Sequence, residues 1–302
     1  MSFVTLVQWV GPSCAQWGYE LLRKLRLADL PDEVHGEVLA ALNPYHARKV
    51  DPPIASVKHV LDALVKVPKI KVDHHGGGYG RIVQLYPRAI YDFILQRAAR
   101  YEKLGRKGRY QAVPHDILAR FQLAGLSAET DFDEICAFLW EQMMGKVPEH
   151  MCYVWRELFQ GIVLDRVDFW LPKLTAEVKV ATSLKQLQAL MEVIHFDGSL
   201  IVFNFPNFTK TVLQRAEDLE GTEGYERVRS TLLVVSGPRI RSGTNGELDK
   251  DYVESEAAKA ATTHAADSVL APFYRWIVEV EQRQRDQNLK RYQADMASMD
   301  EE

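Results

Sequence analysis

Apolar residues recur at intervals of three and four along several parts of the chain, which places them on one face of a helix. In residues 52–67, for example, Ile54, Val57, Val60, Leu61 and Leu64 share a face. By the same spacing we predict helices over residues 14–28, 30–42, 88–104, 131–145, 183–195, 209–221 and 264–293. Amphipathic helices of this kind each bury one side against a neighbouring element.

Other apolar runs are shorter and favour strands, because they are rich in branched and aromatic residues and are bounded by turn residues. These segments are residues 151–158, 162–171, 174–181, 199–206 and 229–237. Together with the helices, they predict an α-β-β-β-α-β-α-β order from residue 131 onward. The expected fold class is therefore α/β (mixed), with helices on the faces of a sheet.

Residues 69–75 and 81–87 flank a glycine-rich stretch, residues 76–80, which predicts a β-hairpin. Three helices followed by a hairpin, over roughly residues 14–101, resemble the winged-helix family of DNA-binding domains. The resemblance implies that the third helix enters the major groove and that the wing contacts the DNA backbone. It places Ser56, Lys58, His59 and Lys66 on the groove side of the helix, and Lys69, Lys71, Tyr79 and Arg81 on the wing.

Charge is distributed unevenly along the chain. Residues 1–115 hold 17 Lys and Arg against 10 Asp and Glu, a net charge of +7, whereas the remaining residues hold 20 against 31, a net charge of −11. A basic first part joined to an acidic remainder favours a polyanion-binding module attached to a unit with another task. Residues 102–115 add Gly, Pro and four basic residues without apolar periodicity, which predicts a linker that can follow a nucleic-acid backbone.

The three cysteines, Cys14, Cys136 and Cys152, are scattered and have no metal-ligand spacing. That pattern favours the reducing cytoplasm and argues against a disulfide framework or a zinc site. We find no apolar run of membrane-spanning length and no signal-peptide pattern, so we expect a cytoplasmic protein without membrane contact.

Three charged residues lie within the predicted strands: Asp168, Glu177 and Lys179. Residues two apart in a strand point to the same face, so Glu177 and Lys179 would project together, and a hairpin over residues 166–181 would bring Asp168 beside them. Buried carboxylates need a compensating charge, and an Asp–Glu oxygen pair suits Mg²⁺. A neighbouring lysine can stabilise the charge that develops during phosphodiester hydrolysis.

An Asp, a short turn and Glu-x-Lys within this element order are similar to the PD-(D/E)xK (restriction-endonuclease-like) nuclease superfamily, over roughly residues 130–236. The resemblance implies that Asp168 and Glu177 bind Mg²⁺, for which Mn²⁺ would substitute, and that Lys179 is the catalytic lysine. It also implies a metal-binding glutamate on the first helix, Glu134 or alternatively Glu141. A glutamine on the helix after the Glu-x-Lys strand would be Gln188 or Gln186.

These interpretations divide the chain into a winged-helix domain (1–101), a basic linker (102–115), a nuclease-like domain (116–292) and a disordered tail (293–302). The expected function is that of a Mg²⁺-dependent endonuclease that cuts double-stranded DNA as a homodimer, in restriction, defence or a mobile element. The alternative is a non-catalytic DNA-binding regulator, with an RNA-processing nuclease ranked last. An apolar stripe on the last helix, formed by Val269, Phe273, Trp276 and Val280, is either the dimer surface or part of the core of its own domain.

Overall fold

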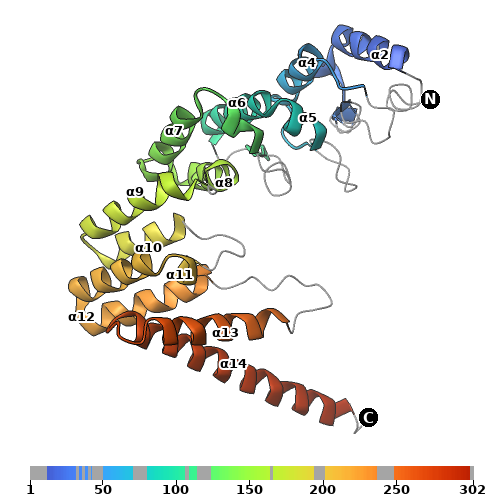
Figure 1. Cartoon of the computed structure of the whole chain (residues 1–302). Helices are drawn as coiled ribbons and strands as arrows, with labels where there is room; N and C mark the ends of the chain where they lie inside the picture. The colour runs from blue at the N-terminus through green and yellow to red at the C-terminus, as the bar shows by residue number, and fades with distance from the viewer. Residues whose placement is uncertain are drawn as a thin grey trace. The chain divides into compact units, whose positions relative to one another are not determined.

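The structure is a computed structural model, and it divides into two compact units, Met1–Val167 (unit 1) and Asp168–Glu302 (unit 2). It describes residues 12–31, 34–35, 38–39, 42, 50–70, 80–105, 109–113, 124–163, 166–193, 201–236 and 248–299. Every regular element in these ranges is a helix (Figure 1). The expected α/β fold is therefore wrong, and with it the resemblance to the winged-helix and PD-(D/E)xK families, both of which require strands.

The regular elements described in unit 1 are helices. Its α-helices are α2 (Pro12–Lys24), α4 (Ile54–Leu64), α5 (Gly80–Leu85), α6 (Pro87–Leu104), α7 (Phe132–Met144) and α8 (Cys152–Ile162). The described 3₁₀ helices of this unit are η1 (Leu27–Asp29), η3 (Ala124–Ala128) and η4 (Glu149–Met151). α4 packs against α2, η1 and α6, and α7 packs against α8.

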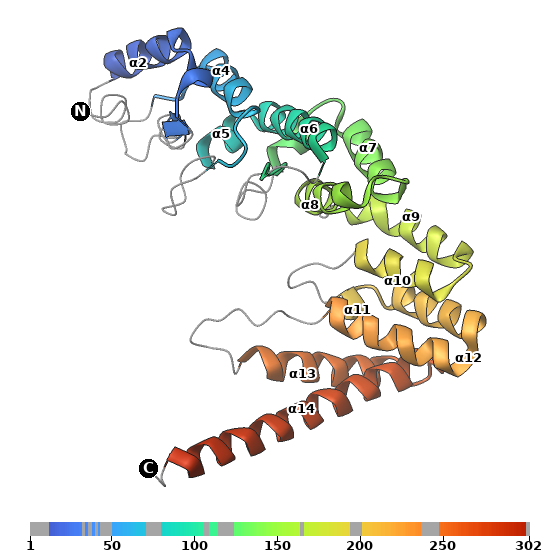
Figure 2. The same cartoon turned by 180° about the vertical axis from the view of Figure 1, so that it is seen from behind.

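Unit 2 is likewise helical, and its helices pair mainly with neighbours in the sequence. They are α9 (Val167–Val180), α10 (Leu184–Val193), α11 (Ile201–Asn204), α12 (Pro206–Ser236), α13 (Leu248–Thr263) and α14 (Leu270–Met299). α13 and α14 lie side by side as a helical hairpin, as both Figure 1 and the reverse view in Figure 2 show. α10 packs on α12, which in turn contacts α11 and α14.

Two glycines shape α12. The helix is interrupted at Gly221, where φ is 61° and ψ is −147°, a conformation that side-chain-bearing residues rarely adopt. Just beyond the break, a Cβ atom added to Gly224 would lie 2.4 Å from the carbonyl oxygen of Ala216. The absence of a side chain at Gly224 therefore lets the second segment of α12 approach the backbone of the first.

The predicted strands within the described residues are helical, and their buried residues follow the helical period. In α8, which covers the predicted strand at 151–158, the buried residues are Val154, Trp155, Leu158, Phe159 and Ile162. In α9, Trp170, Leu174 and Val178 are buried at intervals of four. The run 229–236 belongs to α12, and residues 201–204 form α11. Short apolar runs satisfy either period, so packing against neighbouring helices decided between them.

The predicted wing is also wrong where the structure describes it. Residues 80–85, most of its expected second strand, form α5. Residues 71–79, which would have supplied the rest of the hairpin, lie outside the described residues.

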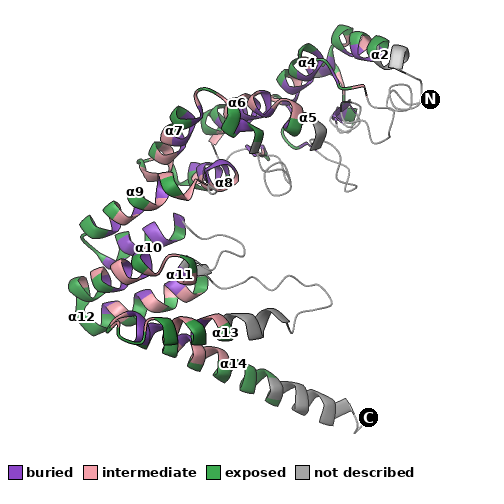
Figure 3. Cartoon of the chain, viewed as in Figure 1, coloured by how far each residue is buried: buried purple, intermediate pink, exposed green. Residues whose placement is uncertain are grey.

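Several predicted helices are confirmed, with shifts of a few residues at their ends. α4, α6, α7, α10 and α14 fall within or close to the predicted ranges, whereas α13 was not among the predicted helices. Of the predicted stripe, Phe273 is buried within unit 2, beside the equally buried Ile277, whereas Val269, Trp276 and Val280 are half-buried. Burial decreases along α14: Phe273, Tyr274 and Ile277 near its start are buried, whereas residues 282–288 are all exposed (Figure 3). The homodimer stays a prediction.

None of the described helices combines the length and the apolar character needed to cross a lipid bilayer.

Candidate nucleic-acid interface

The predicted hydrolytic residues do not converge on one point. Asp168, Glu177 and Lys179 all lie on α9. Asp168 and Lys179 are about 16 Å apart along the helix axis, at 1.5 Å per residue. Glu177 and Lys179 would have shared a face of a strand, but on a helix they project roughly 160° apart.

The remaining predicted members of the nuclease site lie on other helices. Glu134 and Glu141 are exposed on α7 in unit 1. Gln188 donates from Nε2 to Thr231 Oγ1 at 3.4 Å, which joins α10 to α12. Gln186 accepts a hydrogen bond from the backbone N–H of Thr182 at 3.0 Å, at the start of α10.

The proposed magnesium centre therefore loses the sheet geometry on which it depended. In the parts of the chain that the structure describes, no group of three His, Cys, Asp or Glu side chains is placed to hold a metal ion. Nuclease activity itself stays a prediction.

Two of the predicted DNA-contacting residues on α4 instead hold unit 1 together. Ser56 is buried and donates from Oγ to the carbonyl oxygen of Tyr19 at 3.2 Å. A ring nitrogen of the half-buried His59 lies 3.0 Å from the carbonyl oxygen of Leu25. Both side chains are thus used at the contact between α4 and the end of α2.

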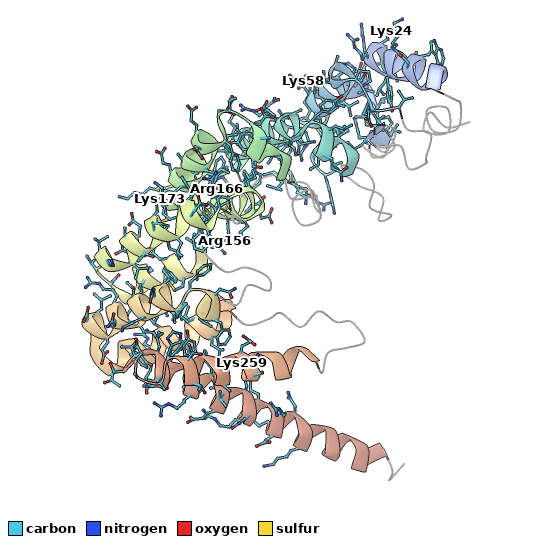
Figure 4. All side chains as sticks on the ribbon, in the orientation of Figure 1. Lys24, Lys58, Arg156, Arg166, Lys173 and Lys259 are labelled. Carbon is cyan, nitrogen blue, oxygen red and sulfur yellow. The ribbon has the colours of Figure 1, made fainter. Side chains whose placement is uncertain are left out.

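The predicted cations at the surface have a different environment. Lys58, Lys66 and Lys69 are exposed, and Figure 4 labels Lys58 on α4. Lys71, Tyr79 and the side chain of Arg81 lie outside the described residues, although the backbone of Arg81 belongs to α5. Lys66 and Lys69 lie just after the end of α4, where the chain meets α6.

A buried arginine organises this meeting point. Arg97 lies on the same face of α6 as Ile90, Phe93 and Ile94, and its side chain has no exposed surface. Its guanidinium donates to five backbone carbonyl groups, those of Leu64, Val67, Pro68, Gln111 and Ala112. We call this arrangement the Arg97 node. The distances include 2.6 Å from Nη1 to Leu64 and 3.2 Å from Nε to Ala112.

The node compensates a buried positive charge with backbone dipoles and aromatic rings. The carbonyl group of Leu64 belongs to the last turn of α4, where helix carbonyl groups lack intrahelical partners and favour a cation. The guanidinium carbon also lies 4.5 Å from the ring centroid of Tyr110 and 5.7 Å from that of Phe93. Arg97 thereby binds two separate segments, residues 64–68 and 110–112, onto α6.

Further hydrogen bonds join the same two segments directly. The Gln111 N–H donates to the Pro68 carbonyl group at 2.8 Å, and the Tyr110 hydroxyl donates to the Val65 carbonyl group. Burial raises the pKa of Tyr110, and the charges of Arg97 and Arg100 oppose that shift. The phenol is therefore neutral at physiological pH, as its role as a hydrogen-bond donor requires.

Five exposed cations surround the Arg97 node. They are Lys66, Lys69, Arg100, Lys103 and Arg109, which we call the basic cluster. Lys66 adjoins Val67 and Lys69 follows Pro68, and the carbonyl groups of Val67 and Pro68 both accept hydrogen bonds from Arg97. Arg109 directly precedes Tyr110. The guanidinium carbon of Arg100 lies 5.8 Å from the Tyr110 ring centroid, and Lys103 follows one turn later on α6.

Acidic residues are sparse in the described segments that carry the basic cluster. Two acidic residues, Asp62 and Glu102, lie in residues 62–70, 97–105 and 109–113. The same three segments contain six Lys and Arg residues, namely Arg97 and the five cations of the cluster. Within the described residues, no cation of the cluster has a carboxylate in ion-pairing distance. By contrast, Lys210 and Lys259 in unit 2 each lie 2.7 Å from a carboxylate oxygen.

An aromatic trio, formed by Tyr101, His150 and Tyr153, adjoins the cluster. The Tyr101 ring centroid lies 5.5 Å from that of His150 and 5.8 Å from that of Tyr153, both in edge-to-face geometry. Burial and a hydrogen bond with Tyr101 raise the pKa of Tyr153 to about 12, while a backbone hydrogen bond with Ala112 acts in the opposite direction. Tyr153 thus contacts the same segment as Arg97, yet 39% of its surface is exposed.

The sequence indicated part of this interface. Lys66 and Lys69 were among the predicted DNA-contacting residues, and Lys103 and Arg109 lie in the predicted basic linker. Arg97, Arg100 and the aromatic trio were not predicted. The signal for Arg97 was its position on the apolar face of the helix at 88–104.

Comparison with known proteins identified no relative: no family model, no curated protein and no solved structure matches the chain.

Proposed function

We propose that this chain is a DNA-binding protein and that unit 1 contacts the phosphate backbone of duplex DNA through the basic cluster. The observation that carries the proposal is the gathering of five exposed, unpaired cations around the Arg97 node in the described part of unit 1. Lysine and arginine side chains in such a cluster neutralise phosphates and release condensed counterions. The proposed interface differs from a winged helix, since α4 uses Ser56 and His59 for packing.

Within the cluster itself, the residues favour contact with duplex phosphates over stacking on the bases of a single strand. Proteins that bind single strands without sequence preference usually interleave exposed aromatic rings with basic residues. Tyr110, the ring at the centre of the cluster, is only 6% exposed and is covered by Arg97 and Arg100. The cluster therefore supports phosphate contact rather than base stacking, and its affinity should depend little on DNA sequence.

The proposal is tested by the salt dependence of binding. A fluorescently labelled duplex is titrated with the full chain at several NaCl concentrations, and the logarithm of the binding constant is plotted against that of the salt concentration. Each phosphate contact contributes about −0.9 to the slope. We expect the double variant Lys66→Ala/Lys69→Ala to weaken binding and to make the slope shallower by about 1.8.

A matched control separates this effect from a general loss of charge. Lys185 on α10 and Lys173 on α9 are both exposed in unit 2, so the double variant Lys173→Ala/Lys185→Ala removes the same charge outside the cluster. This control should retain the wild-type slope. Equal effects of the two double variants, or a wild-type slope near zero, would contradict the proposal.

A further inference from the structure

The aromatic trio provides a contact that the basic cluster lacks. Tyr110 is buried at the centre of the cluster, whereas Tyr153 exposes 39% of its surface beside it. Tyr101 directly follows Arg100 on α6 and lies in edge-to-face contact with both other rings. An exposed aromatic side chain next to phosphate-binding cations is the combination that stacks on an unpaired base.

The position of Tyr153 is held from two sides. Tyr101 contacts it in edge-to-face geometry from α6, and the backbone of Ala112 lies close enough to its hydroxyl group to lower the pKa of that group. The carbonyl group of Ala112 in turn accepts a hydrogen bond from Nε of Arg97. The ring and the cations are therefore fixed to the same backbone segment, so DNA held by the cations would lie next to the ring.

We infer that unit 1 prefers DNA that carries an unpaired nucleotide at the end of a duplex, and that Tyr153 stacks on the unpaired base while the basic cluster holds the adjoining duplex phosphates. This inference rests on the proposed function. It adds a base contact, and with it a preference among DNA structures. Bases inside an intact duplex are already paired and stacked on their neighbours, and freeing one costs free energy, so a blunt duplex would bind through the cations.

The test compares two duplexes of identical sequence, one blunt and one with a three-nucleotide adenine overhang, in competition for the full-length protein. We expect the wild-type protein to bind the overhang duplex about tenfold more tightly, the effect of one stacked base. Tyr153→Ala should abolish this preference and retain the wild-type affinity for the blunt duplex. Tyr153→Phe, which keeps the ring and loses the hydroxyl group, should retain the preference.

Several results would overturn the inference. It fails if the wild-type protein binds both duplexes equally, if Tyr153→Ala weakens both to the same extent, or if Tyr153→Phe loses the preference as Tyr153→Ala does. If duplex binding still requires Lys66 and Lys69 in these cases, the proposed function stands without the aromatic contact. If the wild-type protein binds neither duplex, the proposed function itself fails.

A second measurement needs no variant and therefore remains decisive if Tyr153→Ala does not fold. The first overhang nucleotide is replaced by 2-aminopurine, whose fluorescence falls when the base stacks on an aromatic ring. Addition of the wild-type protein should quench this signal in the overhang and leave an internal 2-aminopurine in the blunt duplex unchanged. Equal responses at the two positions, or no response at the overhang, would contradict stacking.

Discussion

The guanidinium of Arg97 donates from Nη1 to the carbonyl oxygen of Leu64 at 2.6 Å, which ties the last turn of α4 to the buried face of α6. The same side chain holds residues 110–112 through Gln111 and Ala112. A fully buried arginine thus determines where the segments bearing Lys66, Lys69 and Arg109 lie. Its function is to position the basic cluster, because it has no exposed surface with which to contact DNA.

Replacing Arg97 should disrupt both the packing of unit 1 and DNA binding. Arg97→Met removes the donors of five carbonyl groups, and we expect a loss of about 3 kcal/mol or more in the free energy of unfolding. Hydrogen exchange followed by mass spectrometry should show faster exchange in residues 64–69 and 109–113. Arg100→Met serves as the control, since this exposed residue should lower DNA affinity without altering exchange. Unchanged exchange in Arg97→Met would contradict the positioning role.

Asp267 connects the turn before α14 to α12. Its carboxylate lies 2.7 Å from Nζ of Lys210 and accepts hydrogen bonds from the N–H groups of Val269 and Leu270 at 2.9 and 3.1 Å. These hydrogen bonds and the Lys210 charge lower the pKa of Asp267 to about 2. Because the folded-state pKa is below the ordinary value of 3.8, the stabilisation is present above about pH 4 and is lost as the pH falls toward 2.

Substitutions at Asp267 should separate helix capping from the ion pair. Asp267→Ala removes both and is expected to cost about 1–2 kcal/mol, a typical value for loss of an N-cap. Asp267→Asn keeps a good capping side chain and removes the charge, so its cost at neutral pH should be smaller. Urea denaturation at pH 7 and pH 3 measures both. Equal losses of stability in the two variants at pH 7 would mean that the ion pair with Lys210, and not helix capping, is the larger contribution of Asp267.

The two glycines of α12 should differ in why they resist substitution. Gly221→Ala forces a side chain into a backbone conformation that only glycine adopts readily, at a cost of about 1–3 kcal/mol, although open space surrounds the new Cβ atom. Gly224→Ala would place Cβ 2.4 Å from the Ala216 carbonyl oxygen, so the two segments of α12 must move apart. Thermal melting should show a lower midpoint for both variants. A wild-type midpoint for Gly224→Ala would mean that the close approach is not required.

Removing divalent metal should not reduce DNA binding by this protein. In the proposed binding mode the basic cluster contacts phosphates directly, so we expect gel shifts in EDTA to match or exceed those in Mg²⁺, which competes for the DNA phosphates. The same incubations, with plasmid as substrate and Mg²⁺ or Mn²⁺ present, also test hydrolysis. Metal-dependent nicking that is lost in both Glu177→Ala and Lys179→Ala would support the endonuclease prediction despite the helical structure of α9.

The long amphipathic segments were predictable because their apolar residues repeat over several turns. α4 and α6 were expected within a few residues of their observed ends, since Ile90, Phe93 and Ile94 can share a face only in a helix. The strand predictions for the shorter apolar runs were wrong because those runs are too short to distinguish the period of a strand from that of a helix. Around Glu177, alternation of apolar and polar residues over a few positions fits a strand, while Trp170, Leu174 and Val178 equally fit a helix.

The sequence by itself determined the basic first part, the acidic remainder and the amphipathic character of the longest helices, because charge and periodicity are properties of the chain alone. Only the tertiary structure decided that α9 is a helix and that its charged residues are separated. It alone revealed that Arg97 gathers residues from three segments, because long-range hydrogen bonds leave no regular spacing in a sequence. A buried guanidinium needs acceptors wherever the fold supplies them, and here it finds backbone carbonyl groups 14 to 33 residues away.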